Sequence, residues 1–345
     1  MNKEIHMSNP LSLLVEGQNL TQDQAEAFFG QMIKGECDPA QLAAVLTALK
    51  IKGETPEEIA GAALAIRQSA TLFPTQENPV ADCVGTGGDG ANTINISTTA
   101  AILAAACGLK MAKHGNRSVS SMSGSADLLE ALGVDLMMSP QTASNCLAEA
   151  NICFLYAPAY HSGFRHAAPV RKAMGIRTLF NILGPLVNPA QPQVMLLGVY
   201  IPELINTIAK ALTLTGVKRA WVVHGDGLDE IALHGTTTLT EINNGQLVER
   251  TLTPQDFGLS QYSLESIKGG TPQENAEFIK AILAGKGKEA HNAAVIINCA
   301  ALLYLHGKTD NLKEAAKTAS EVLASGKAAT TLATLVNVSN QEEQR

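Results

Sequence analysis

The alternation of two residue patterns from about residue 80 onward most constrains the fold of this chain. Short runs of β-branched and other apolar residues alternate there with longer runs whose apolar residues recur at helical spacing. Because parallel strands need crossover connections, this alternation predicts an α/β fold with a mainly parallel sheet covered by helices. Strands are expected at 80–84, 109–112, 152–156, 194–199 and 220–223, and helices at 97–107, 127–132, 140–150 and from 202 onward.

Two later regions depart from this alternation. Residues 158–184 contain no strand pattern but many proline, glycine, arginine and histidine residues. Residues 237–251 resemble a hairpin, and Asn244 with Gly245 suits a tight primed turn between its strands. The last third of the chain is predicted to be helical, including residues 290–305 and 311–324.

The first seventy or so residues predict helices only. Three helices are expected at residues 22–35, 39–53 and 57–70. Thr21 with Gln24, and Thr55 with Glu58, have the spacing of a capping box. Apolar residues in each helix recur at three- and four-residue spacing, so each helix has one face to bury. This pattern predicts a small bundle, which either packs on its own or also forms a subunit interface.

Charge and composition exclude several classes of protein. The chain of 345 residues has a formal net charge of −7, so it has no general attraction for nucleic acid or anionic lipid. None of its six cysteines forms a CxxC pair, which is typical of free thiols in a reducing compartment. The most apolar stretch, residues 100–108, is about half of a membrane span, and no secretory signal is visible. We therefore expect a cytoplasmic protein that binds neither nucleic acid nor membrane.

Residues 84–90, VGTGGDG, lie between an expected strand and an expected helix. Glycines let the backbone approach a ligand closely and turn N–H groups toward an oxyanion such as diphosphate. The segment contains GxGxxG, but a dinucleotide fold needs an acidic residue at the end of the next strand, where this chain has Lys113 and His114. No GK[ST] follows either, so the Walker pattern fails. A phosphate-binding loop and a plain tight turn remain as interpretations.

The segment Asn95-Ile96-Ser97-Thr98 precedes an apolar helix. Its amide and hydroxyl side chains can cap that helix. Because they follow the glycine segment closely, they can also hold a phosphate or a metal-bound water. Both interpretations remain open from the residues alone.

Residues 113–125, KHGNRSVSSMSGS, combine two cations, five serines and two glycines. Nothing in this segment favours a core strand or helix. A disordered linker is one interpretation, but the flanking segments are strongly patterned. Lysine and arginine supply charge, and serine hydroxyls and N–H groups supply geometry, so the segment can wrap the anionic end of a ligand.

Residues 224–230, HGDGLDE, directly follow an expected strand, which is where α/β sheets bind ligands. Adjacent carboxylates in such a loop are typical of a magnesium site completed by water and substrate phosphates. A solvated acidic turn is the alternative. An acid–base pair of the glycosidase kind is disfavoured, because sequence neighbours rarely flank a bond from opposite sides.

Residues 158–166 and 171–177 gather aromatic, histidine and arginine side chains without a strand pattern. An arginine in such a region can bind a substrate carboxylate through two parallel hydrogen bonds. A basic surface helix is the alternative interpretation.

Taken in order, these motifs resemble the signature set of the anthranilate phosphoribosyltransferases. The matching segments are GTGGDG, NIST, KHGNRSVSSMSGSADLLEALG, FRHAAPVRKAMGIRTLFNILGPLVNP and HGDGLDEIAL. The resemblance covers nearly the whole chain. It implies a magnesium-dependent pentosyltransferase of tryptophan biosynthesis, which joins anthranilate to phosphoribosyl diphosphate and releases diphosphate. It also implies a homodimer that pairs through a small helical domain.

The resemblance further implies a discontinuous domain plan. The helical domain would comprise residues 1–75 and 168–192, and the α/β domain that binds the donor would comprise 76–167 and 193–345. The domains would close on substrates, with hinges near 78–80 and 166–194.

The resemblance also assigns residues to the two substrates and the metal. The donor would contact Gly85, Gly88, Asp89, Thr93, Asn95, Ile96, Ser97, Thr98, Lys113, His114, Gly115, Asn116, Arg117, Ser118, Val119, Ser120, Ser121 and Ser125. Mg²⁺ would be held by Ser97, Asp229 and Glu230. Anthranilate would contact Gly85, Asn116 and Arg171, the last facing its carboxylate. No residue is assigned as a catalytic nucleophile or base, and the roles of His114 and His161 stay unassigned.

Two rival functions remain at this point. A pyrimidine nucleoside phosphorylase has the same fold, but it is expected to have KHSxR where this chain has KHGNR. A relative without activity that binds nucleic acid is disfavoured by the acidic charge and by the retained Asp229 and Glu230.

Overall fold

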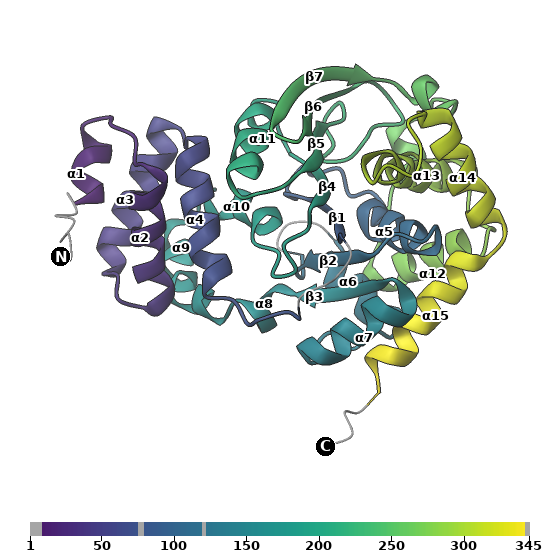
Figure 1. The fold of residues 1–345 in the computed structure, drawn as a ribbon, viewed down its shortest axis with the longest axis horizontal. Helices are drawn as coiled ribbons and strands as arrows, with labels where there is room; N and C mark the ends of the chain where they lie inside the picture. Colours follow the sequence, from purple (N-terminus) through teal and green to yellow (C-terminus); the bar gives the residue numbers. More distant parts are fainter. Residues whose placement is uncertain (1–8, 75–78, 119–121, 342–345) are drawn as a thin grey trace.

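The computed structural model describes residues 9–74, 79–118 and 122–341, and it places a helical lobe beside an α/β lobe (Figure 1). The helical lobe begins with α1 (Pro10–Val15), α2 (Gln22–Lys34), α3 (Pro39–Lys52) and α4 (Pro56–Gln68). The predicted capping boxes at Thr21 and Thr55 are both formed. The short helix α1 was not predicted, because six residues are too few to show a helical period.

A seven-stranded sheet forms the centre of the α/β lobe. Its strands are β1 (Ala81–Gly85), β2 (Met111–Gly115), β3 (Ile152–Tyr156), β4 (Val194–Gly198), β5 (Arg219–His224), β6 (Thr237–Asn243) and β7 (Gln246–Leu252). In the order β3-β2-β1-β4-β5-β6-β7, the first five strands are parallel. The last two are antiparallel and form the predicted hairpin, with positive φ at both Asn244 and Gly245.

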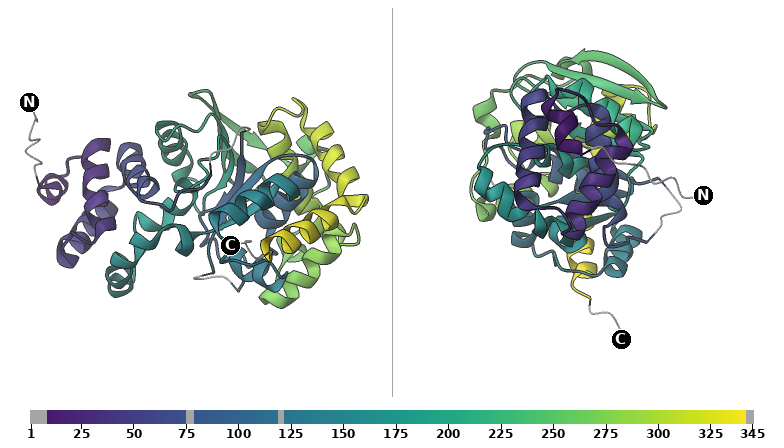
Figure 2. Two further views of the ribbon diagram at one scale, coloured as in Figure 1. Left: turned by 60° about the horizontal axis from the view of Figure 1, so that its bottom comes forward. Right: turned by 90° about the vertical axis from the view of Figure 1, so that its left-hand side faces the viewer.

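Helices cover both faces of this sheet. The remaining α-helices are α5 (Ile96–Ala106), α6 (Ser125–Ala131), α7 (Pro140–Ala150), α8 (Ala157–Tyr160), α9 (Ala168–Met174), α10 (Phe180–Leu183), α11 (Leu204–Leu214), α12 (Pro272–Leu283), α13 (Glu289–Leu305), α14 (Leu312–Ala324) and α15 (Lys327–Ser339). Alternate residues of β5 point to opposite cores: Trp221 packs with α5 and α13, whereas Val222 packs with α11 and the helical lobe. Figure 2 shows the sheet between these two layers. The predicted α/β fold class is confirmed.

The crossover between β3 and β4 joins the two lobes. It contains α8, α9, α10 and the 3-10 turns Ser162–His166 and Gly184–Leu186, and no strand lies in it. Two glycines let other segments pack closely: a Cβ at Gly163 would collide with Ile33 of α2, and one at Gly35 would collide with His166. Much of the crossover therefore packs onto the helical lobe, whereas the proposed domain bounds and hinges stay predictions.

One strand was placed incorrectly from the sequence. The strand predicted at 109–112 is β2, Met111–Gly115, so it includes Lys113 and His114, which are 2% exposed. The predicted range stopped at Ala112, before these two polar residues, whereas here both side chains lie inside the protein. Similarly, Ser125 begins α6 and does not belong to an irregular segment. Within the described residues, no helix is long and apolar enough to span a membrane.

Candidate active site

The site lies where the strand order reverses. The chain proceeds from β1 outward to β2 and β3, and then returns to place β4 on the other side of β1. Loops that leave the carboxyl ends of two such strands diverge and leave a crevice, the usual ligand site of an open α/β sheet. A cavity of about 900 Å³ opens at this point, and the loops after β1, β2, β4 and β5 contribute to its wall together with the crossover.

Two paired glycines let the acidic loop, residues 224–230, pack across these strand ends. Gly85 ends β1, and its partner Gly198 ends β4. A Cβ at Gly85 would collide with the carboxylate of Asp229, and one at Gly198 would collide with the backbone of Asp229. The N–H of Gly87 donates to Asp229 Oδ2 at 2.6 Å. The acidic loop therefore contacts the glycine loop, residues 85–90, directly.

The carboxylates of Asp229 and Glu230 are largely buried without enough positive charge around them. Burial, Asp89 and Glu230 together raise the pKa of Asp229 well above its ordinary value. Burial also raises the pKa of Glu230 to about 7, although Lys113 opposes that rise. Because buried charge is costly unless paired, this pair favours a bound cation.

Ser97 and Lys113 are partners of Glu230, in addition to the Gly87 N–H that bonds Asp229. The N–H of Ser97, in the first turn of α5, donates to Glu230 Oε1 at 3.1 Å. Lys113 Nζ donates to the carbonyl of Cys83 at 2.6 Å, and its charge favours ionised Glu230. Lys113, Ser97 and Glu230 all line the cavity. The structure therefore brings the predicted phosphate-binding lysine close to two of the predicted metal ligands.

Asn95 connects two loops and does not cap α5. It is the N-cap residue, yet its side chain makes no capping hydrogen bond. Asn95 Nδ2 donates to the carbonyl of Ser123 at 3.0 Å, and Asn275 Nδ2 donates to Asn95 Oδ1 at 2.8 Å. The capping interpretation of Asn95 is wrong, because its amide bonds Ser123 and so holds that part of the serine-rich segment, residues 113–125, beside the cavity.

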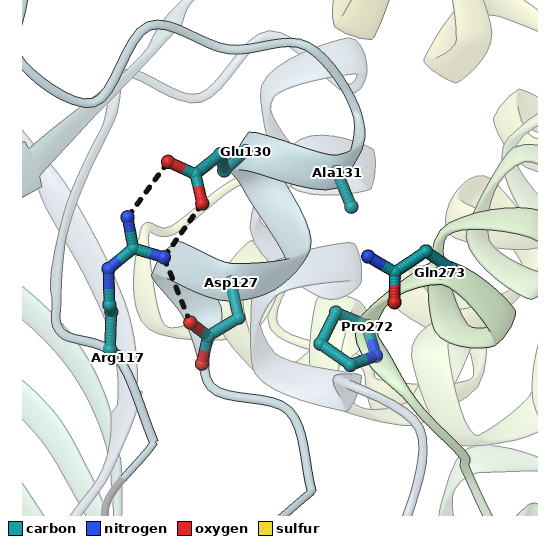
Figure 3. Close-up of a pocket in the computed structure, with 6 residues that line it drawn as sticks. All are labelled: Arg117, Asp127, Glu130, Ala131, Pro272 and Gln273. Atoms are coloured by element: carbon teal, nitrogen blue, oxygen red, sulfur yellow. Dashed lines mark hydrogen bonds and ion pairs between the residues drawn. The ribbon is translucent and has the colours of Figure 1, made fainter.

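Arg117 is paired with acidic side chains of α6 (Figure 3). Its guanidinium donates to both carboxylate oxygens of Glu130, at 2.7 and 2.8 Å, and to Asp127 Oδ1 at 3.1 Å. Asp127 Oδ2 also accepts from the N–H groups of Ser118 and Gly124, at 2.9 and 3.0 Å. These bonds draw together the two ends of the serine-rich segment. A smaller cavity of about 450 Å³ lies beside this cluster, between Arg117 and Gln273.

The crossover supplies the opposite wall with arginine and aromatic side chains. The guanidinium carbon of Arg171 lies 5.2 Å from the ring centroid of Phe180, and burial lowers the pKa of Arg171. No acidic partner of Arg171 occurs in the part of the chain that the structure describes. This arginine is therefore free to bind a ligand carboxylate.

Two neutral histidines lie between the walls. The rings of His114 and His161 meet edge to face, with their centroids 5.1 Å apart. Burial, then the neighbouring His161, lowers the pKa of His114 to about 3, and burial lowers that of His161 to about 4. At neutral pH both rings are therefore uncharged and line the cavity as polar, non-ionic groups.

Two family models match most of the chain. The model described as "Glycosyl transferase family, helical bundle domain" matches residues 11–70, and the one described as "Glycosyl transferase family, a/b domain" matches residues 77–329. The anthranilate phosphoribosyltransferase of Colwellia psychrerythraea is 73% identical over 334 residues, which are 96% of this chain and 92% of that protein. This chain belongs to the anthranilate phosphoribosyltransferase family.

Solved structures of the family have the same fold. The anthranilate phosphoribosyltransferase of Thermus thermophilus matches with a TM-score of 0.92 at 42% identity, over 97% of this chain and 100% of that chain. The Saccharomyces cerevisiae enzyme in complex with PRPP and Mg matches with a TM-score of 0.87 at 32% identity, over 97% and 99% of the two chains. The yeast enzyme in complex with 4-fluoroanthranilate matches with a TM-score of 0.86 at 32% identity, over 97% and 99%. The family resemblance drawn from the motifs is confirmed.

Most residues assigned by the family resemblance line the cavity at the switch point. They are Gly85, Gly88, Asn95, Ser97, Thr98, Lys113, His114, Gly115, Asn116, Arg117, Ser118, Ser125, Arg171, Asp229 and Glu230. Asp89, Thr93 and Ile96 do not line it: Thr93 is bridged to Lys268, and Ile96 packs in the core. Val119, Ser120 and Ser121 lie outside the described residues. The individual roles of all these residues stay predictions.

Tyr200 and Arg177 are among the residues of the cavity wall that were not assigned from the sequence. Tyr200 follows β4, and Arg177 belongs to the crossover. The position of Tyr200 just after a strand end is a signal that points to it. For Arg177 the sequence gives only a basic segment, because its contact partner in the glycine loop lies 89 residues earlier in the chain.

Proposed function

We propose that this chain transfers the phosphoribosyl group of 5-phosphoribosyl 1-diphosphate to the amine of anthranilate. The products are N-(5-phosphoribosyl)anthranilate and diphosphate, in tryptophan biosynthesis. The observation that carries the proposal is the pair Asp229 and Glu230, packed against the glycine loop at the switch point. The yeast relative with PRPP and Mg has the same fold at 32% identity.

The donor fits the wall formed by the glycine loop and the start of α5. The glycine loop has positive φ at Gly87, Gly88 and Gly90, so its N–H groups can turn toward an anion. The helix dipole of α5 places partial positive charge at Ser97 and Thr98. These groups would bind the diphosphate and stabilise it as negative charge develops on departure.

Asp229, Glu230 and Ser97 are the residues that would hold magnesium. Their fit to a metal rests on the raised pKa values of both carboxyls. Burial and neighbouring carboxylates disfavour the charged forms, and a cation beside them would offset both effects. No group of three or more acidic, histidine or cysteine side chains among the described residues could form a complete metal cage. That agrees with magnesium, which completes its shell with water and substrate phosphates. The chemistry supplied by the bound ion is neutralisation of the leaving diphosphate.

The acceptor fits the wall formed by the crossover. Arg171 would bind the carboxylate of anthranilate, and the uncharged rings of His114 and His161 line the same cavity. The anthranilate amine is an uncharged arylamine at neutral pH, so its attack on C1 needs positioning more than a strong base. No catalytic nucleophile is therefore proposed.

We also propose a cytoplasmic homodimer that pairs through the helical lobe. Two large apolar side chains of that lobe face solvent, Val15 at the end of α1 (73% exposed) and Ile51 in α3 (82% exposed). A second copy would cover them. Sedimentation analysis should give twice the mass of the chain, whereas a monomer at micromolar concentration would refute the pairing.

Anthranilate fluorescence offers a direct test of the activity. The signal should decay when the protein, phosphoribosyl diphosphate and Mg²⁺ are present together, and it should stay constant when any one is left out. Uridine or thymidine with inorganic phosphate should give no free base. Release of base without any loss of anthranilate would replace the proposal with a nucleoside phosphorylase.

A further inference from the structure

Arg177 connects the crossover to the glycine loop. Its Nη2 donates to the carbonyl of Gly88 at 2.8 Å. Its guanidinium carbon lies 4.4 Å from the ring centroid of Tyr200, a distance typical of a cation–π contact. One side chain of the crossover therefore contacts both the loop after β1 and the turn after β4.

The contact fixes the backbone of Gly88 itself. Gly88 has a φ of +85°, which only glycine adopts readily, and a Cβ there would lie 2.7 Å from Arg177 Nη2. The guanidinium thus occupies the space beside this glycine and holds its carbonyl. Because a peptide is planar, holding the carbonyl of Gly88 also fixes the direction of the next N–H in the glycine loop.

A second bond supports the same loop from within the α/β lobe. There the Gly87 N–H donates to Asp229 Oδ2. The loop is therefore held on one side by the acidic loop and on the other by the crossover, which also carries Arg171. None of the ion pairs among the described residues involves Arg177, so its bonding capacity is directed to Gly88 and Tyr200.

We propose that Arg177 is a positioning residue that holds the glycine loop in its donor-binding conformation. This inference rests on the proposed function and adds to it that a crossover residue sets the affinity for the donor. Loss of Arg177 weakens donor binding without removing any group that contacts anthranilate. The chain offers a matched control in Arg67 of α4, which donates to the carbonyl of Thr215 at 3.1 Å, also between the helical lobe and the α/β lobe but away from the cavity.

Steady-state kinetics of the full-length protein test this proposal with Arg177→Gln, Arg177→Lys and Arg67→Gln. Arg177→Gln should raise the KM for phosphoribosyl diphosphate about tenfold, the effect of losing one charge-assisted hydrogen bond. Its KM for anthranilate and its kcat at saturation should stay within about twofold of the wild type. Arg177→Lys, which keeps a charged donor, should recover part of the donor KM. Arg67→Gln should lower the melting temperature and leave both KM values unchanged.

Three outcomes would overturn the proposal. They are an unchanged donor KM in Arg177→Gln, an equal rise in both KM values, and a donor KM that rises as much in Arg67→Gln. If the wild type itself shows no turnover, calorimetric titration with phosphoribosyl diphosphate and Mg²⁺ replaces kinetics, and equal affinity of wild type and Arg177→Gln would refute the inference. Absence of wild-type turnover counts against the proposed function, whereas these comparisons between variants count against Arg177 alone.

Discussion

Two glutamates of this chain, both removed from bulk solvent, have opposite surroundings. Glu58, at the start of α4 in the helical lobe, accepts from the N–H groups of Leu20 and Thr55 at 2.9 and 2.8 Å, and from Lys52 Nζ at 3.0 Å. Glu230 in the cavity accepts from Ser97, but it lies beside Asp229, and its pKa is raised to about 7. Glu58 is fully buried and Glu230 lines the cavity wall, yet among the described residues only Glu58 of these two has its charge balanced by a direct ion pair.

The difference separates a structural acid from a functional one. A buried carboxylate with a full set of donors stabilises the fold, and removing it leaves its partners unsatisfied. A desolvated carboxylate beside another carboxylate destabilises the isolated fold and is retained for what it binds. The two sites should therefore respond in opposite ways to neutral substitutions.

The largest expected effect is on turnover. The double variant Asp229→Asn, Glu230→Gln should lose about a thousandfold in kcat, because the leaving diphosphate is no longer neutralised. Turnover measured against Mg²⁺ concentration checks this prediction. A double variant with unchanged Mg²⁺ dependence would remove the metal-binding role of the pair.

The next effect concerns the structural glutamate. Glu58→Ala should lower the free energy of unfolding by about 4 kcal/mol, because it removes the ion pair with Lys52 and the acceptor of two backbone N–H groups. Urea unfolding followed by circular dichroism measures this change. Glu277→Ala, which breaks the exposed ion pair of Glu277 with Lys280, should leave the midpoint nearly unchanged. Equal shifts in the two variants would show that the buried network of Glu58 stabilises the fold no more than the exposed ion pair does.

The functional glutamate should give the opposite sign and a pH dependence. Folding raises the pKa of Glu230 from 4.5 to about 7, so the folded state binds this proton more tightly and loses stability as the pH rises through that window. In EDTA, the free energy of unfolding of the wild type should fall by about 3 kcal/mol between pH 4.5 and 8 because of this group, and Glu230→Gln should not show that fall. Asp82, with a pKa raised to about 6, titrates in both proteins and cancels in the difference, whereas Asp229, whose pKa Glu230 helps to raise, adds to it. Parallel stability curves for the two proteins would contradict this account.

The smallest expected effect lies on the crossover wall. Arg171→Ala should raise the KM for anthranilate about tenfold and leave the KM for the donor almost unchanged, because it removes one carboxylate-binding group. The exposed neighbour Lys172 provides the matched control, and Lys172→Ala should change neither value. Equal changes in both KM values would remove the orienting role of Arg171.

The fold was largely readable from the sequence because most elements satisfy local rules. Thr21 and Thr55 open their helices as capping boxes, and Asn244 with Gly245 turns the hairpin. The end of β2 was missed because the burial of Lys113 and His114 depends on tertiary packing and not on local sequence. Polar side chains that serve a ligand site often lie at buried strand ends.

The site was readable as a set of segments but not as a set of contacts. The family resemblance grouped Asp229, Glu230 and Ser97, and the structure brings them to one cavity. The pairing of Arg117 with Glu130 and the bond from Arg177 to Gly88 were not foreseen. Spacing indicates which residue types are near a strand end, but a side chain's partner depends on packing between elements distant in sequence.

Calorimetric titration of the wild-type protein with phosphoribosyl diphosphate tests the central claim most directly. With Mg²⁺ present, the account predicts saturable heat of association, and in EDTA it predicts that this heat is lost. The Asp229→Asn, Glu230→Gln protein should resemble the wild type in EDTA whether or not Mg²⁺ is added. Equally tight binding of the donor with and without Mg²⁺, or no binding in either condition, would contradict the account.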